Sequence, residues 1–79
     1  GDDEHARRYF DKAVKLFDLR LAGGGDDPFT RYYMAALHAL RGDADAARRH
    51  LEKPLRELPI FTRWRLSRDP DFDPVRELV

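Results

Sequence analysis

Residues 27–59 read DPFTRYYMAALHALRGDADAARRHLEKPLRELP, and this segment predicts two consecutive helices joined by a tight turn. Pro28 suits the first turn of a helix, and Asp27 before it can cap the free amides. Gly42 tolerates the left-handed conformation that ends a helix, and Asp43 can cap the helix that follows. Because the turn is so short, we expect the two helices to be antiparallel and in contact.

Each predicted helix has one apolar stripe at spacings of three and four residues, as amphipathic helices do. The stripe of the first helix consists of Phe29, Tyr33, Leu37 and Leu40. The stripe of the second helix consists of Ala44, Ala47, Leu51, Leu55 and Leu58. Pro54 falls inside the second helix and removes one hydrogen bond there, so we expect a kink near residues 51–54.

This segment resembles the tetratricopeptide repeat (TPR). That helix pair carries a small residue in its first helix and a glycine at the turn, then an alanine, a large apolar residue and a closing proline. Here those places are held by Ala35, Gly42, Ala47, Leu51 and Pro59. Small residues at Ala35 and Ala47 would let the two backbones approach closely. The chain departs from the family pattern at Arg31, His38 and Pro54, where tryptophan, tyrosine and alanine are usual. The alternative is an unrelated helical hairpin.

Composition limits the classes of partner. The chain has 79 residues, which make one small domain near the size at which a single core only just outweighs chain entropy. Fifteen basic and fifteen acidic residues cancel, which argues against a dominant nucleic-acid or anionic-membrane surface. There is no cysteine, hence no disulfide framework or thiolate chemistry. No apolar run approaches the ~18 residues of a membrane span.

A further helix is predicted before this pair, and Asp2 or Asp3 can cap its start. Its apolar stripe consists of Ala6, Phe10, Ala13, Val14, Phe17 and Leu21. The stripe looks like the second helix of a preceding TPR whose first helix is missing. Because the chain begins at Gly1 rather than Met, we expect a piece of a longer protein, such as the terminal part of a TPR array, or a tag remnant.

Residues 23–27, three glycines followed by two aspartates, form a polar connector. We expect residues 23–26 to be the most mobile internal segment, because three glycines raise the entropy of the free chain. A glycine run can bind phosphate, but no Lys-Ser or Lys-Thr follows, and two carboxylates would repel the ligand. No nucleotide or other cofactor is therefore predicted.

After Pro59 the sequence predicts a short aromatic helix at residues 60–64, followed by a doubled Asp-Pro signal at residues 69–74 that allows only single turns. The segment is similar to the tails that close TPR arrays, where an apolar element covers the last helix. The residues expected to cover the second helix of the pair are Phe61, Trp64, Phe72, Val75 and Leu78. Burial of Trp64 and Phe72 is the sharpest form of this prediction.

Catalytic chemistry is not expected. His38 and His50 lie on opposite helices of the pair, but without a spaced carboxylate they fall short of a zinc or acid/base site. We expect His38 at the edge of the core in place of a tyrosine, and His50 in solvent. Thr62 and Ser67 lack the context of an activated nucleophile. No catalytic or metal site is predicted.

Arg63, Trp64, Arg65 and Arg68 group cations around one aromatic residue, which is a pattern of single-stranded nucleic-acid binding. The competing interpretation is that Trp64 packs inward while the arginines stay solvated beside the aspartates of residues 69–73. Zero net charge favours the second interpretation. We therefore expect no nucleic-acid and no membrane partner.

The sequence thus predicts an all-α domain: an antiparallel TPR-like hairpin with an extra N-terminal helix and a short C-terminal capping element. The resemblance implies a protein–protein interaction scaffold that binds a peptide or helix, or caps a longer array. Its groove positions would be Phe29, Tyr32, Ala36, Ala39 and Asp43, with Tyr32 partly exposed. These residues lack the cationic pattern that clamps C-terminal carboxylates. The alternative is a homodimer formed through the first helix.

Overall fold

The computed structural model describes residues 2–79. Its elements are α1 (Asp2–Ala22), α2 (Pro28–Leu40), α3 (Ala44–Glu57), α4 (Pro59–Leu66) and the 3-10 helix η1 (Pro70–Leu78). Residues 2–79 contain no strand, which confirms the all-α class. The predicted capping by the Asp2 side chain falls outside the described residues, and Asp3 lies within α1.

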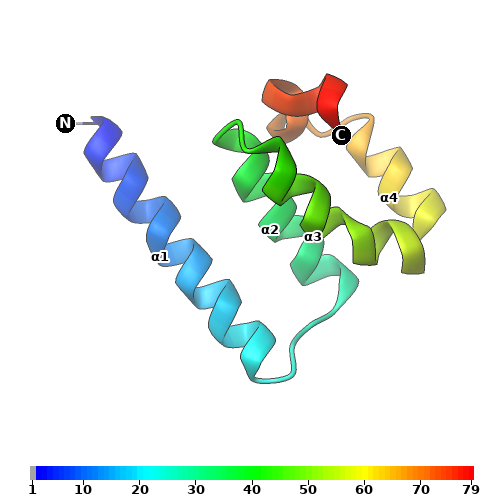
Figure 1. The fold of residues 1–79 in the computed structure, drawn as a ribbon, viewed down its shortest axis with the longest axis horizontal. Coiled ribbons are helices and arrows are strands. Elements are labelled where there is room, and N and C mark those ends of the chain that lie inside the picture. The colour runs from blue at the N-terminus through cyan, green and yellow to red at the C-terminus, as the bar shows by residue number, and fades with distance from the viewer. Residues whose placement is uncertain (1) are drawn as a thin grey trace.

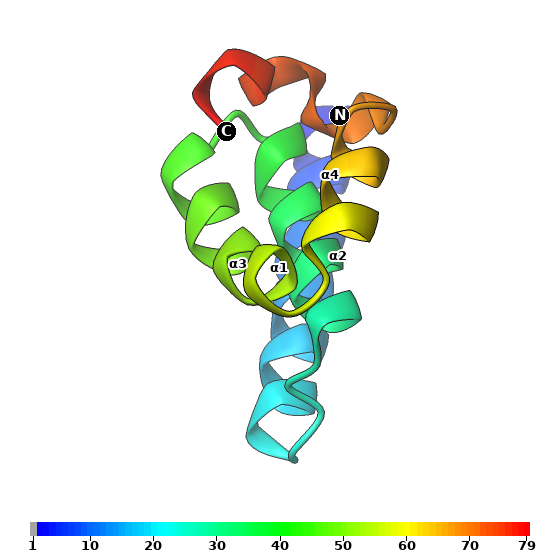
Figure 2. The same cartoon turned by 90° about the vertical axis from the view of Figure 1, so that its right-hand side faces the viewer.

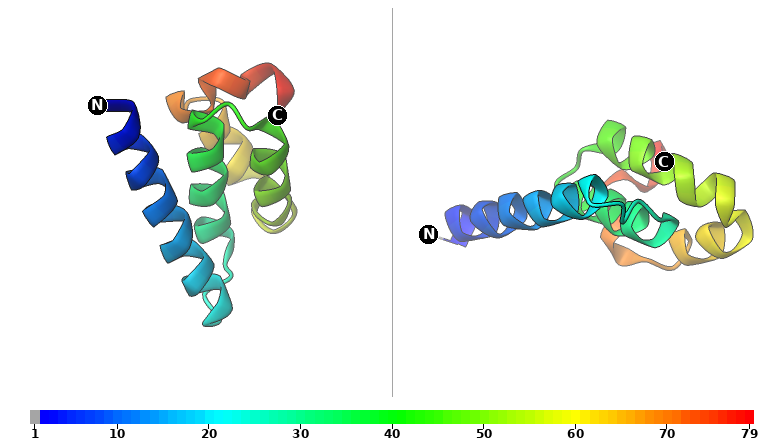
Figure 3. Two further views of the ribbon diagram at one scale, coloured as in Figure 1. Left: turned by 60° about the vertical axis from the view of Figure 1, so that its left-hand side comes forward. Right: turned by 90° about the horizontal axis from the view of Figure 1, so that it is seen from below.

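Helix α2 occupies the centre of the molecule. It lies between α1 and α3 (Figure 3, left), and α4 lies on the side of the molecule away from α1 (Figure 1). The C-terminal η1 crosses the end of the α2–α3 pair (Figure 2). Every other helix is thus arranged around α2.

The boundaries of α2 and α3 have local causes that the sequence predicts. Asp27 accepts hydrogen bonds from the Thr30 amide at 2.8 Å and the Thr30 hydroxyl at 3.0 Å. Asp43 caps α3 by accepting from the Ala46 amide at 3.1 Å. At Gly42, φ is 76°, and the amides of Gly42 and Asp43 donate to the carbonyls of Ala39 and His38. This pattern is the Schellman motif that ends helices at a left-handed glycine.

The connector after α1 ends that helix in the same way. At Gly24, φ is 94°, and the amides of Gly24 and Gly25 donate to the carbonyls of Leu21 and Arg20 at 3.2 and 2.8 Å. Asp26 pairs with Arg31 at 2.8 Å, which ties the connector to α2. These bonds restrain the connector. The expected mobility of residues 23–26 stays a prediction.

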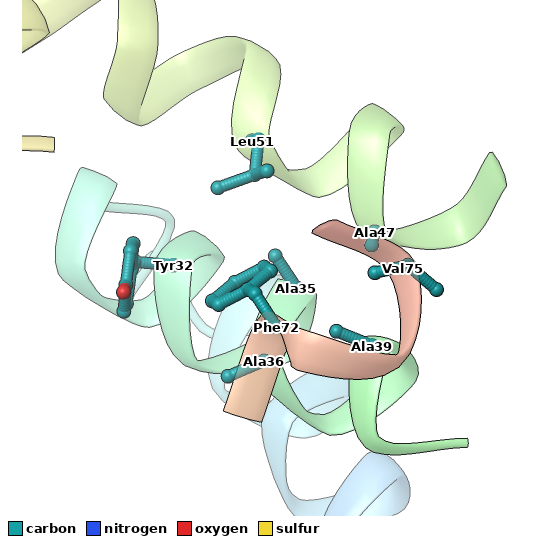
Figure 4. Close-up of a cluster of buried hydrophobic side chains, with 8 residues drawn as sticks. All are labelled: Tyr32, Ala35, Ala36, Ala39, Ala47, Leu51, Phe72 and Val75. Atoms are coloured by element: carbon teal, nitrogen blue, oxygen red, sulfur yellow. The ribbon is translucent and has the colours of Figure 1, made fainter. Parts of the chain in front are cut away.

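The core lies between α2, α3 and η1. Its members are Tyr32, Ala35, Ala36, Ala39, Ala47, Leu51, Phe72 and Val75 (Figure 4). Ala35, Ala39 and Ala47 are fully buried, and their small side chains leave room for the aromatic ring of Phe72 beside Leu51. The small alanines thus leave space in the core, and the ring of Phe72 fills this space.

The buried face of α2 differs from the predicted apolar stripe. Tyr32, Ala36 and Ala39 pack inward, while Phe29, Tyr33 and Leu40 are exposed. One residue along an α-helix corresponds to a rotation of ~100°, so the stripe lies about a quarter turn from the core face. The physical reason is that α2 is apolar on most sides, and close packing selects its small residues.

Of the five C-terminal residues expected to cover α3, two are buried and three are exposed. Phe72 is fully buried, as predicted, and Val75 is buried beside it. Trp64 is 55% exposed, so the predicted burial of Trp64 is wrong. Residues on the other side of α4 make the contacts: the Thr62 hydroxyl donates to the Pro54 carbonyl at 3.0 Å, and Leu66 packs against the core. Trp64 is therefore turned outward.

The tail is also more regular than expected. Residues 70–78 form one continuous 3-10 helix rather than separate single turns. Arg76 holds the preceding loop by donating to the carbonyls of Leu66 and Asp69 at 2.7 and 2.6 Å. The Tyr32 hydroxyl donates to Asp69 at 2.7 Å and joins this loop to α2.

Candidate interaction surface

One side of α2 carries large apolar side chains that the rest of the described chain leaves about half exposed. Phe29, Tyr33 and Leu40 recur at spacings of four and seven residues, so they share one helix face. Tyr33, in the middle of the row, is 46% exposed. Together they form an apolar strip along the outer side of the central helix.

A groove borders this strip where α1 diverges from α2. Tyr9, Leu16 and Phe17 of α1 form one wall. Tyr33, Leu37 and Leu40 of α2 form the other wall. Arg20 and Asp71 also line the groove, and its volume is about 460 Å³, within the range of ligand pockets. The groove is open and apolar, and it suits an apolar segment.

At the other end of the strip, aromatic side chains continue onto α4. The ring centroids of Phe29 and Phe61 are 6.1 Å apart, at an interplanar angle of 71°, and those of Phe61 and Trp64 are 6.4 Å apart. The first of these pairs is edge-to-face, a geometry that stabilises by roughly 0.5–1.5 kcal/mol beyond area burial. The exposed apolar surface therefore runs from α4 across α2 to the α1 groove.

Arg65 fixes the junction between α4 and α2. Its guanidinium carbon lies 4.6 Å from the ring centroid of Tyr32 and 5.2 Å from that of Tyr33. A hydrogen bond with Tyr33 raises the pKa of Arg65 further. Burial, with the hydrogen bond to Asp69 second, raises the pKa of the Tyr32 hydroxyl well above its usual range. Tyr32 thus serves as a structural donor, while Tyr33 beside it stays partly open.

His38 and His50 are stacked between helices. Their ring centroids are 5.3 Å apart at an interplanar angle of 7°, and Arg31 lies 3.1 Å from Nδ1 of His50. Phe10 of α1 meets the His38 ring edge-on at 5.5 Å, and Arg41 lies 4.3 Å from the Phe10 centroid. Burial lowers the pKa of both imidazoles. His38 lies at the core edge as expected, but His50 is half-buried, so its predicted solvent exposure is wrong.

The five predicted partner-binding residues do not form an open groove. Tyr32 is 4% exposed, and Ala36 and Ala39 are buried in the core, so the expected partial exposure of Tyr32 is wrong. Asp43 is exposed, but its carboxylate caps α3. Phe29 is the one of the five that lies on the apolar strip.

Sequence reasoning missed Tyr33, Phe61 and Trp64 as surface residues. It assigned Tyr33 to the core because it continues an apolar stripe at helical spacing, and the other two because apolar residues recur in the polar tail. A signal was present in the alanines: Ala35, Ala36 and Ala39 mark the side of α2 where backbones approach, which leaves the adjacent bulky row for the outside. The outward aromatics of α4 could not be found in this way, since their orientation depends on how Thr62 and Leu66 pack.

The described residues contain no group of three or more His, Cys, Asp or Glu side chains that could hold a metal ion. The stacked histidines do not converge on a common point with a carboxylate. No helix in residues 2–79 is long and apolar enough to cross a membrane.

Comparison of the chain with protein-family models, with curated proteins and with solved structures found no match. The TPR resemblance therefore stays a prediction, and the surface described above is the basis for any statement about function.

Proposed function

We propose that this protein is a protein-interaction module of the TPR type, which binds a peptide or helix of another protein along the outer strip of α2. The observation that carries the proposal is the row Phe29, Tyr33 and Leu40, exposed on the central helix beside an apolar groove of about 460 Å³. Exposed apolar surfaces that run over several elements mark interaction sites in soluble proteins.

The position of the strip supports this function. Helix α2 is held from behind by α3 and η1, so its outer side is presented on a rigid element. Tyr33 is a suitable anchor, because Arg65 lies against its ring and limits its movement. Rigid aromatic anchors dominate many interfaces, since they bury large area at low entropic cost.

The test is selection of binders from a random linear peptide library displayed on phage, followed by titration of the selected peptides against variants. Tyr33→Ala should weaken binding about tenfold or more, because a central anchor contributes ~2 kcal/mol. Glu52→Ala, an exposed residue on α3, is the matched control and should bind as the parent does. Circular dichroism checks that each variant is folded. Failure to select any peptide that depends on Tyr33 would refute the proposal.

Self-association is a second candidate, favoured by α1. Besides its inward stripe, α1 exposes Tyr9, Leu16 and Leu19, with Leu19 69% exposed. Two copies of such a helix could bury these residues against each other in a two-fold interface. Size-exclusion chromatography with light scattering decides the matter: a monomer at every concentration rejects the dimer, while a dimer that Leu16→Glu dissociates supports it.

A further inference from the structure

Helix α4 presents a second kind of surface, both aromatic and cationic. Ile60, Phe61 and Trp64 lie on its outer side, with Ile60 86% exposed. Arg68 follows the end of α4 and lies on this side too, because its guanidinium carbon is 4.7 Å from the ring centroid of Trp64. Phe29 of α2 adjoins it through its contact with Phe61. We name this set, with Arg63 at its border, the α4 face.

The charges of the α4 face are uncompensated. Residues 58–68 contain three arginines and no acidic residue, although the whole chain is neutral. Across the described residues, carboxylates lie within 4 Å of Arg8, Arg31, Arg48, Lys53, Arg56 and Arg76. Among the described residues, no carboxylate lies within 4 Å of Arg63, Arg65 or Arg68. Three of the cations that lack a carboxylate partner thus lie in one short segment beside exposed aromatic side chains.

We propose that the α4 face binds an acidic segment of a partner protein, in which large apolar residues are flanked by Asp or Glu. The apolar residues would cover Ile60, Phe61 and Trp64, and the carboxylates would pair with Arg63 and Arg68. Arginine suits this role, because its planar fork binds carboxylates in bidentate fashion. This inference rests on the proposed interaction function and names the class of partner.

Single-stranded nucleic acid is the competing class of anion, and two features disfavour it. The guanidinium of Arg68 lies 4.7 Å from the ring centroid of Trp64, so it covers one face that a base would need for stacking. Arg65 lies against the rings of Tyr32 and Tyr33 and is only partly exposed, so it presents little positive charge to a phosphate backbone. The surface therefore fits a chain that is apolar at its centre and anionic at its edges.

Trp64 is the single tryptophan of the chain, so its fluorescence reports directly on the α4 face. The probes are peptides selected from the random display library, versions with every Asp and Glu replaced by Asn and Gln, and a single-stranded RNA oligonucleotide. We expect the selected peptides to be net acidic, to shift Trp64 emission, and to bind about tenfold more weakly at high salt. The peptides with Asn and Gln in place of Asp and Glu should bind more weakly than the acidic ones by a similar factor.

Charge reversal supplies the matched variants. Arg63→Glu combined with Arg68→Glu should weaken the acidic peptides at least tenfold, whereas Arg7→Glu, an exposed arginine of α1, should leave the affinity unchanged. Equal binding of acidic and neutral peptides, or tighter binding of the RNA, would overturn the inference. Peptides that need Tyr33 but leave Trp64 emission unchanged would overturn it while the interaction function stands. If no peptide binds, both proposals fail.

Discussion

The molecule has two regions that differ in how much of their surface is buried. One is the body formed by α2, α3 and η1, and the other is the N-terminal helix α1. Every fully buried side chain among the described residues lies between residues 30 and 75, and none belongs to α1. The inward stripe of α1, including Phe10 and Phe17, is only half-buried. An amphipathic pattern therefore predicts that a helix has an inward face, but not how firmly that face is held.

The largest expected effect lies in the body. Phe72→Ala should lower the free energy of unfolding by about 3–5 kcal/mol, because it empties a fully buried aromatic site. Phe17→Ala, on half-buried α1, should lower it by roughly 1–2 kcal/mol, since part of that ring already contacts water. Urea unfolding followed by circular dichroism measures both. Equal losses would remove the distinction between the two regions.

The two regions should also open separately. We expect amides in the middle of α1 to exchange with solvent about tenfold faster than those in the middle of α2 and α3, because α1 can detach while the body stays folded. Hydrogen exchange with residue resolution by NMR tests this expectation. Uniform protection across α1, α2 and α3 would indicate one cooperative unit.

The sequence predicted the parts of this structure that depend on local chemistry. The caps Asp27 and Asp43 and the left-handed Gly42 require only a few neighbouring residues, and all three occur as expected. Which face of α2 is buried depends instead on competition between a bulky row and an alanine row. Packing density decided that competition in favour of the alanines, which moved Tyr32 into the core and Tyr33 to the surface.

The candidate surface was harder to predict for the same reason. Phe29 was identified, but Trp64 was assigned to the core because it is one of five apolar residues that recur in a polar tail. Its orientation follows from the hydrogen bond between Thr62 and the Pro54 carbonyl, which fixes the rotation of α4. Contacts of this kind join positions that no local pattern connects.

Low pH should weaken the packing of α1 against the rest of the molecule. Burial lowers the pKa of His38 and His50 below the usual value of 6.5, so the unfolded chain binds more protons than the folded one just below that pH. The free energy of unfolding should therefore fall as pH drops below about 6.5. The groups facing the pair are Arg31, Arg41, Arg49, Asp18 and Asp43.

The measurement is the urea midpoint between about pH 7.5 and pH 5, a range in which histidine changes charge. Because Phe10 of α1 contacts His38, the α1 amides should lose protection first. The double variant His38→Gln, His50→Gln should flatten the pH dependence, whereas His5→Gln, an exposed residue of α1, should not. An unchanged slope in the double variant would show that other groups cause it.

The smallest effects come from the two helix-ending glycines, which differ in what they connect. Gly24 and Gly42 have φ values of 94° and 76°, and a Cβ at either site would meet no atom within 4 Å. Alanine at each position thus introduces backbone strain of about 1 kcal/mol without a steric clash. Gly42 joins α2 to α3 inside the body, so Gly42→Ala should lower the free energy of global unfolding by that amount. Gly24 joins α1 to the body, and α1 can relax by detaching. Gly24→Ala should therefore change the urea midpoint little while it speeds amide exchange in α1. If both substitutions shift the midpoint equally, α1 and the body unfold together.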